Sequence, residues 1–147
     1  MEQVLALTPP RTLVHSDYKL ENLLFGTPEA VSVIDWQLPR RGRGVFDVAF
    51  FLCQSLDTPM RRSVEMDLMQ IYHRTLEADG VAGYSFEQCQ YDYRLALLGR
   101  FGALISMIAA LPLREDQLRM HIEVLLLRNV AAIVDHSAGD LLVSLDQ

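Results

Sequence analysis

The sequence predicts an α+β fold that is mostly helical, in which a small β-hairpin element lies on a helical bundle. Short apolar segments bounded by Pro, Asp, Asn or Gly fill residues 12–34, which is typical of strands joined by turns. From about residue 47 onward, apolar residues recur at helical spacing between helix-capping and helix-breaking signals. No linker, repeat or low-complexity tract divides the 147 residues, so we expect a single domain over 1–147.

Three short strands are expected in the N-terminal part, at Thr12–Val14, Leu23–Phe25 and Val31–Ile34. The first two flank a loop, His15–Asn22. The last two are joined by a turn at 26–30 that contains Gly and Pro, so they should pair antiparallel. That pairing brings Asn22 and Asp35 side by side.

Four helices are expected in the remainder, each with its own boundary signals. The expected helices are Asp47 to Leu56, Met60 to Asp79 (started by Thr58-Pro59 and stopped by Gly80), Ser85 to Ala110 (opened by a capping box to Gln88 and ended by Pro112), and Arg114 to Asp135. The acidic pair Glu115-Asp116 falls in the first turn of the last helix, where it favours the helix dipole without a further role.

Composition excludes several classes of protein. The net charge of −6 argues against a nucleic-acid partner, and the N-terminus lacks the pattern of a signal peptide. The most apolar run, Leu95–Leu113, contains Arg100, so it is predicted to be a buried core helix and not a membrane span. Cys53 and Cys89 lack metal-ligand spacing and are predicted to be buried free thiols in a reducing, cytoplasmic setting.

The loop and the strand after it carry the candidate chemistry. Asp17 is placed to accept a proton from an incoming hydroxyl, while Asn22 and Asp35 offer the oxygen ligands that Mg²⁺ prefers beside a nucleotide triphosphate. Each residue alone is more often a turn or cap residue. Their ordered spacing between apolar segments favours a phosphoryl-transfer site.

Three segments resemble a known family. They are His15-Ser16-Asp17-Tyr18-Lys19-Leu20-Glu21-Asn22, Ile34-Asp35-Trp36-Gln37 and Gly44-Val45-Phe46-Asp47-Val48-Ala49-Phe50-Phe51-Leu52. Together they resemble the aminoglycoside phosphotransferase and choline-kinase-like family, which are ATP-dependent kinases of small molecules with a protein-kinase-like fold. A protein kinase itself is not indicated, because Trp36-Gln37 follows Asp35 and no Ala-Pro-Glu motif is present.

The resemblance implies a role for each motif residue. Asp17 would be the catalytic base, Asn22 and Asp35 the Mg²⁺ ligands, and Lys19 a cation near the transferred phosphate of ATP. His15 and Asp47 would support the loop, Asp47 by accepting backbone N–H groups. Ser16 stands where the family often has Gly; because Ser is small, we expect little effect.

The resemblance covers only the C-terminal lobe of that fold, with the catalytic loop, metal-binding hairpin and first helix in 1–57 and a helical substrate-binding region in 58–147. No glycine-rich phosphate loop precedes the motifs, and Lys19 is the only lysine. We therefore expect an N-lobe to be absent and this chain alone to be inactive, as a truncated transferase or one partner of a split enzyme. Uncovered apolar surface would favour a homo-oligomer. The alternative is a non-catalytic kinase-like remnant or interaction module.

The acceptor is not identified by these motifs. If it is a cation, Glu65, Asp67, Glu87 and Asp92 are the candidate contacts. The basic cluster Arg40, Arg41 and Arg43 is typical of a solvated loop, with contact to an anion or substrate as the alternative. Trp36 and Tyr18 are candidates for either packing or substrate contact. The helical histidines His73, His121 and His136 are interpreted as surface or hydrogen-bonded core residues.

Overall fold

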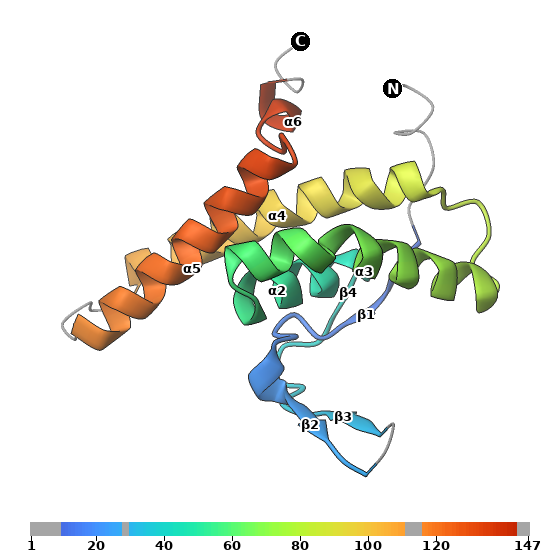
Figure 1. Cartoon of the computed structure of the whole chain (residues 1–147), viewed down its shortest axis with the longest axis horizontal. Helices are drawn as coiled ribbons and strands as arrows, with labels where there is room; N and C mark the ends of the chain where they lie inside the picture. Colours follow the sequence, from blue (N-terminus) through green and yellow to red (C-terminus); the bar gives the residue numbers. More distant parts are fainter. Residues whose placement is uncertain (1–9, 28–29, 111–115, 144–147) are drawn as a thin grey trace.

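A computed structural model describes residues 10–27, 30–110 and 116–143 of this chain. Its helices form one body, and a hairpin extends from that body (Figure 1). The description holds for backbone and side chains except at residues 116–119 and 121, where only the backbone is described.

The β element consists of two separate antiparallel pairs. Strand β1 (Thr12–Val14) pairs with β4 (Arg40–Gly42), and β2 (Leu23–Phe25) pairs with β3 (Val31–Val33). A short 3₁₀ turn, η1 (Leu20–Asn22), leads into β2. The three expected strands are confirmed to within a residue, whereas β4 was not expected. Its Arg-Arg-Gly sequence has no β-branched residue, so its pairing with β1 has no signal in the local sequence.

The helices are α2 (Val45–Ser55), α3 (Thr58–Ala78), α4 (Phe86–Ala110), α5 (Asp116–Asp135) and the short α6 (Asp140–Val143). The capping box of α4 is present: the Ser85 backbone N–H donates to Gln88 Oε1 at 2.8 Å, and the Gln88 N–H donates to Ser85 Oγ at 3.2 Å. Helix α3 begins with Asp57 as its N-cap, which accepts from the Met60 N–H at 2.8 Å. Pro112 and the expected first residues of the last helix, Arg114 and Glu115, lie outside the described residues.

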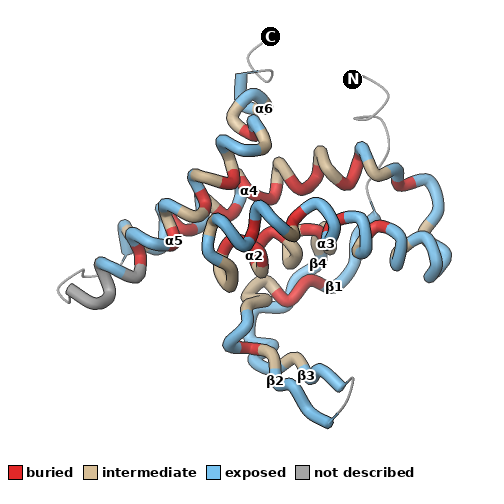
Figure 2. The backbone as a smooth tube through the Cα atoms, viewed as in Figure 1, coloured by how far each residue is buried: buried red, intermediate tan, exposed pale blue. Residues whose placement is uncertain are grey.

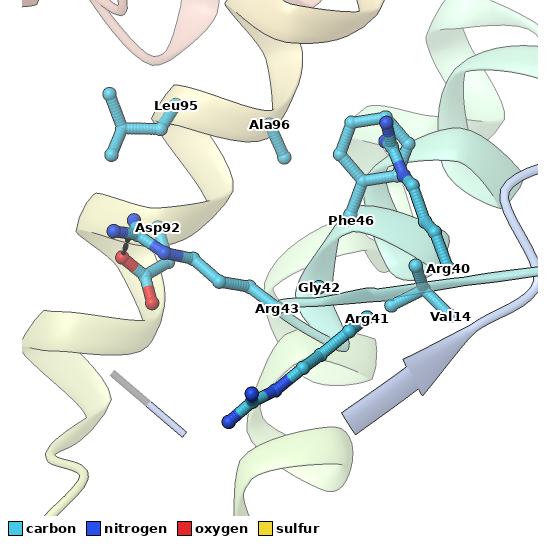
Figure 3. Close-up of a pocket in the computed structure, with 9 residues that line it drawn as sticks. All are labelled: Val14, Arg40, Arg41, Gly42, Arg43, Phe46, Asp92, Leu95 and Ala96. Atoms are coloured by element: carbon cyan, nitrogen blue, oxygen red, sulfur yellow. Dashed lines mark hydrogen bonds and ion pairs between the residues drawn. The ribbon is translucent and has the colours of Figure 1, made fainter. Parts of the chain in front are cut away.

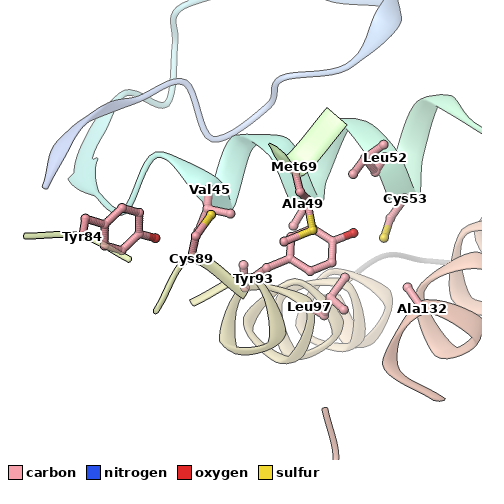
Figure 4. Packing of buried hydrophobic residues seen from close by; sticks show 11 residues of the cluster. Val45, Ala49, Leu52, Cys53, Met69, Tyr84, Cys89, Tyr93, Leu97 and Ala132 are labelled. Atoms are coloured by element: carbon pink, nitrogen blue, oxygen red, sulfur yellow. The ribbon is translucent and has the colours of Figure 1, made fainter. Parts of the chain in front are cut away.

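The hydrophobic core lies where α2, α3, α4 and α5 meet (Figure 4). Helix α2 presents Ala49, Leu52 and Cys53 to Tyr93 and Leu97 of α4. Cys53 is buried and free, as predicted, and burial raises the pKa of its thiol to about 12. Burial likewise raises the pKa of the second buried free thiol, Cys89, to about 11.

Helix α4 is long and apolar enough to cross a membrane, a property that the core helix of a soluble protein shares. Its N-terminal part packs in the core through Tyr93 and Leu97, as predicted for a core helix. Its last two turns differ from that prediction, because Ile105 and Met107 are exposed. The β2–β3 hairpin is also largely exposed (Figure 2), and its exposed residues include Leu24 and Phe25.

Candidate functional site

The first turn of α2 holds the loop between β1 and η1 through hydrogen bonds. The Asp47 carboxylate accepts hydrogen bonds from the backbone N–H of His15 at 2.6 Å and of Ser16 at 2.9 Å. Two charge-assisted bonds from one carboxylate fix the loop at the start of its turn. The contact is the one that the motif resemblance implied for Asp47.

His15 ties the same loop to the end of the hairpin. It is buried, its Nε2 lies 2.8 Å from the carbonyl of Ile34, and its Nδ1 accepts from the Asp17 backbone N–H at 3.3 Å. This pattern requires the proton on Nε2 and the lone pair on Nδ1. Trp36 packs edge-on against the His15 ring at 4.6 Å between centroids, and Tyr18 does so at 6.1 Å. Trp36 is nonetheless about half exposed, so it covers the loop and is not a core residue.

Asp17, Lys19 and Asn22 come together on this loop. The Asn22 side-chain Nδ2 donates to the Asp17 backbone carbonyl at 2.8 Å and to its carboxylate at 3.0 Å. The Lys19 ammonium lies 3.1 Å from the same carboxylate oxygen. Because both hydrogen bonds of the buried Asn22 side chain use Nδ2, its Oδ1 is left for another partner.

Asp35 lies next to Asn22 along the backbone ladder. Leu23 pairs with Val33, and the Ile34 N–H donates to the Asn22 carbonyl at 3.0 Å, so Asp35 follows directly. The Asp35 side chain is exposed, and its contact is with Gln37 Nε2 at 3.4 Å. Among the described residues no group of three His, Cys, Asp or Glu could hold a metal alone, so a divalent ion here would need Asn22 and the oxygens of its nucleotide as well.

Two non-glycine residues of the site have left-handed backbone conformations. Ser16 has φ of 69° and Asp35 has φ of 63°. Such conformations cost about 1–2 kcal/mol for residues with a Cβ. The Ser16 Oγ is also buried and has no hydrogen-bond partner. The prediction that Ser16 has little effect considered only its size and overlooked its backbone conformation.

A cavity of about 630 Å³ opens beside the loop. Asp17, Lys19 and Glu21 contribute to its wall, and α2, α4 and α5 supply apolar side chains such as Phe50, Leu104 and Leu125. Its volume falls within the range of small-molecule sites. Neither Asn22 nor Asp35 lines it, so the cavity extends from the Asp17 side of the loop towards the helices.

The basic segment 40–43 lies mostly in a strand and not in the expected loop, although Arg40 and Arg41 are exposed to solvent as expected. Arg40 and Arg41 lie in β4, the Arg40 guanidinium stacks over the Phe46 ring at 4.4 Å, and Arg43 forms an ion pair with Asp92 of α4 (Figure 3). These residues line a second cavity of about 300 Å³ behind β4. Arg40 also lines the larger cavity, while Arg41 points in a different direction from Arg40.

Two of the four acidic residues considered for a cationic acceptor have protein partners. Burial raises the pKa of Asp92, although Arg43 and the Tyr84 hydroxyl, which donates to it at 3.1 Å, act against that shift. Glu65 accepts from Arg61 at 2.6 Å and from the Tyr93 hydroxyl at 2.5 Å.

The remaining two acidic residues, Asp67 and Glu87, are exposed, and neither they nor the paired two line the larger cavity. Of the helical histidines, His73 bonds to the Tyr84 carbonyl at 2.7 Å and His136 to Glu65 at 2.9 Å, as interpreted from the sequence. The side chain of His121 lies outside the described residues.

Sequence reasoning missed Arg100, which lines the larger cavity from α4. It was considered only as evidence against a membrane span. A single charge inside the apolar run 95–113 was the signal that could have identified it, because such a charge needs a partner or a ligand.

The ecdysteroid kinase-like family matches residues 4–80, just over half of the chain. This chain therefore belongs to the ecdysteroid kinase-like family, a kinase-like family related to the choline kinase and aminoglycoside phosphotransferase group. The relationship inferred from the motifs was right at that coarser level, but the family itself was not the one expected. Comparisons with curated proteins and with solved structures give no match.

Proposed function

We propose that this chain carries the catalytic loop and acceptor site of an ATP-dependent phosphotransferase that acts on a small-molecule hydroxyl. Membership of a kinase-like family supports the reaction class. The observation that carries the proposal is the Asp17 carboxylate, positioned by Asn22 at 3.0 Å and Lys19 at 3.1 Å on the wall of a cavity of about 630 Å³.

In this proposal Asp17 is the general base. The acceptor hydroxyl donates a hydrogen bond to the Asp17 carboxylate and transfers its proton there as its oxygen bonds to the γ-phosphorus of ATP, while the bond to the ADP oxygen breaks. Lys19 lies beside the same carboxylate and is placed to stabilise charge on the transferred phosphoryl group. Asp47 and His15 position the loop and touch no reacting atom.

The donor set of the hairpin fits a hard divalent cation. Asn22 Oδ1 and the Asp35 carboxylate are oxygen ligands on adjacent stretches of backbone, which suits Mg²⁺ bound jointly with nucleotide phosphates. When bound, Mg²⁺ would neutralise phosphate charge. The left-handed backbone at Asp35 is consistent with a residue held for function, since such strain clusters at active sites.

The experiment is a transfer assay with γ-labelled ATP, Mg²⁺ and a panel of alcohols, run on this chain alone and on this chain fused behind the nucleotide-binding lobe of a family member. We expect transfer to at least one alcohol of the panel in at least one of the two forms. Asp17→Asn should lower the rate by roughly 100-fold or more, because the base is lost while its shape is kept. Nucleotide affinity, measured by calorimetry, should change little.

The matched control is Asp67→Asn, the same chemical change at an exposed residue of α3. It should leave the rate unchanged. Retention of activity by the Asp17 variant would remove Asp17 as the base, and absence of transfer to every acceptor in both forms would favour the non-catalytic alternative.

A further inference from the structure

Arg100 is a buried cation that has no acidic partner among the described residues. The residue is only 9% exposed, and its guanidinium stacks over the Phe50 ring at 3.6 Å. Its Nε is buried without a hydrogen-bond partner, and no described residue forms an ion pair with it. Stacking on an aromatic ring satisfies one face of a guanidinium but none of its N–H donors in the plane.

The other buried arginine shows what this environment normally requires. Arg61, which is 1% exposed, also has an unbonded Nε, but its terminal nitrogens have Glu65 and Asp135 as partners. A buried charge left without such compensation is costly. Burial lowers the pKa of Arg100 to about 10. Interactions with Cys53 and then Asp17 act against this shift and Arg40 adds to it, so the group stays protonated at neutral pH. Arg100 therefore keeps its charge and its unused donors.

Those donors belong to a residue on the wall of the larger cavity. Asp17 and Lys19 mark the loop side of that cavity, and Arg100 and Leu104 come from α4, with Ile122 from α5. The rest of the lining is mostly apolar. A molecule filling this space would meet the base on the loop, an apolar wall from the helices, and a planar cation on α4.

We propose that Arg100 binds an anionic group of the acceptor, so that the substrate is a largely apolar organic acid carrying a hydroxyl group. A carboxylate matches the planar fork of a guanidinium in a bidentate pair. The inference rests on the proposed function only in placing the acceptor hydroxyl at Asp17. Cationic acceptors are disfavoured, because the cations on the cavity wall, Lys19, Arg40 and Arg100, outnumber its carboxylates, Asp17 and Glu21.

The nucleotide is the other source of anionic oxygen, and the geometry argues against it. The proposed Mg²⁺ ligands, Asn22 and Asp35, do not line the cavity, whereas Asp17 does. Lys19, which would meet the transferred phosphoryl group, lines the cavity together with Asp17, so the reaction centre would lie at this end of the cavity. We therefore assign the rest of the cavity, including Arg100, to the acceptor.

The test measures binding of ω-hydroxydecanoate and of its uncharged methyl ester by calorimetry, with the whole chain and without nucleotide. We expect the acid to bind about tenfold more tightly than the ester, a difference of about 1.4 kcal/mol. Arg100→Met keeps the length and apolar stem but removes the charge, so it should abolish the difference. Arg100→Lys keeps the charge without the planar fork and should retain part of it, which also covers the case in which the Met variant fails to fold.

The control is Arg94→Met on the same helix, because the Arg94 guanidinium bonds to the Ser137 carbonyl and does not line the cavity. It should preserve the preference for the acid. The inference is overturned if wild type binds acid and ester equally or binds neither, if the preference survives in Arg100→Met, or if ATP alone binds in an Arg100-dependent way. Binding with the expected preference, together with no phosphoryl transfer in either form of the transfer assay, would support the anion site while contradicting the proposed function.

Discussion

The loop-and-hairpin region and the helical body are ordered by different forces. The helical body buries Leu52, Tyr93 and Leu97 in a shared core. The buried residues of the loop are the polar His15 and Asn22, and the described part of the β2–β3 hairpin buries none. Polar bonds to α2 hold the loop, because Asp47 accepts two N–H groups and Ser55 Oγ accepts the Leu20 N–H at 2.9 Å. The difference shows that a largely polar loop can be positioned precisely when a packed helix carries the acceptors.

The same contrast holds for buried charge. In the helical body, Glu65 sits in a closed network with Arg61, Tyr93 and His136. Burial acts to raise the pKa of Glu65, but the hydrogen bonds outweigh burial and leave its pKa lowered. On the cavity wall, Arg100 has no such network. A satisfied cluster indicates a structural role, and an unsatisfied charge beside a cavity indicates a ligand.

The largest effect is expected in the helical body, for Glu65→Ala. The change leaves Arg61 and the Tyr93 hydroxyl buried without one of their partners, and breaking a buried pair in this way costs about 3–5 kcal/mol. Urea denaturation should show this loss in the free energy of unfolding. The control Glu87→Ala, at an exposed position in the first turn of α4, should lower it by no more than about 1 kcal/mol, the size of a helix-dipole interaction. Equal losses in both variants would contradict a special role for the network.

A smaller loss is expected when the link between the two regions is cut by Asp47→Asn. An amide can accept from only one of the two N–H groups and presents its own N–H to the other, so we expect a loss of about 2–3 kcal/mol. Phosphoryl transfer should fall as well, because Asp17 is then held less firmly. Stability is measured by denaturation and loop order by amide hydrogen exchange at Ser16.

The matched control for this change is Asp57→Asn at the N-cap of α3. Asn caps helices about as well as Asp, so stability should be nearly unchanged. If Asp47→Asn were equally neutral, the loop would not depend on α2.

The sequence predicted most of what local signals determine. Strands β1, β2 and β3 were predicted from apolar runs between turns, and the start of α4 was predicted from its capping box. The link from Asp47 to the loop came from motif resemblance and not from any local rule. Strand β4 could not be predicted, because its pairing depends on β1, far away in the sequence.

The partners of the buried charges could not be predicted from the sequence either. The spacing of Arg61 and Glu65 indicates only a surface i,i+4 pair, whereas their burial depends on α4 and α5. Arg100 was visible as a lone charge in an apolar run, but its position beside Asp17 depends on how α4 packs on α2. Asn129 is fully buried with neither side-chain polar atom bonded, and nothing in the structure explains it.

The smallest effect, and one of opposite sign, is expected for Ser16→Gly. Glycine adopts φ of 69° without the Cβ penalty and removes a buried hydroxyl that has no partner, and these gains outweigh its greater entropy in the unfolded chain. The free energy of unfolding should rise by about 1 kcal/mol. Ser16→Ala separates the two causes, since it removes the hydroxyl but keeps the Cβ.

The matched control is Ser137→Gly, at φ of 47° beyond α5, which relieves the same conformation in the helical body. Both glycine variants should stabilise the fold, but only the change at Ser16 should alter the rate of phosphoryl transfer. A destabilised Ser16→Gly would mean that the loop gains more from a stiff backbone than it loses to strain.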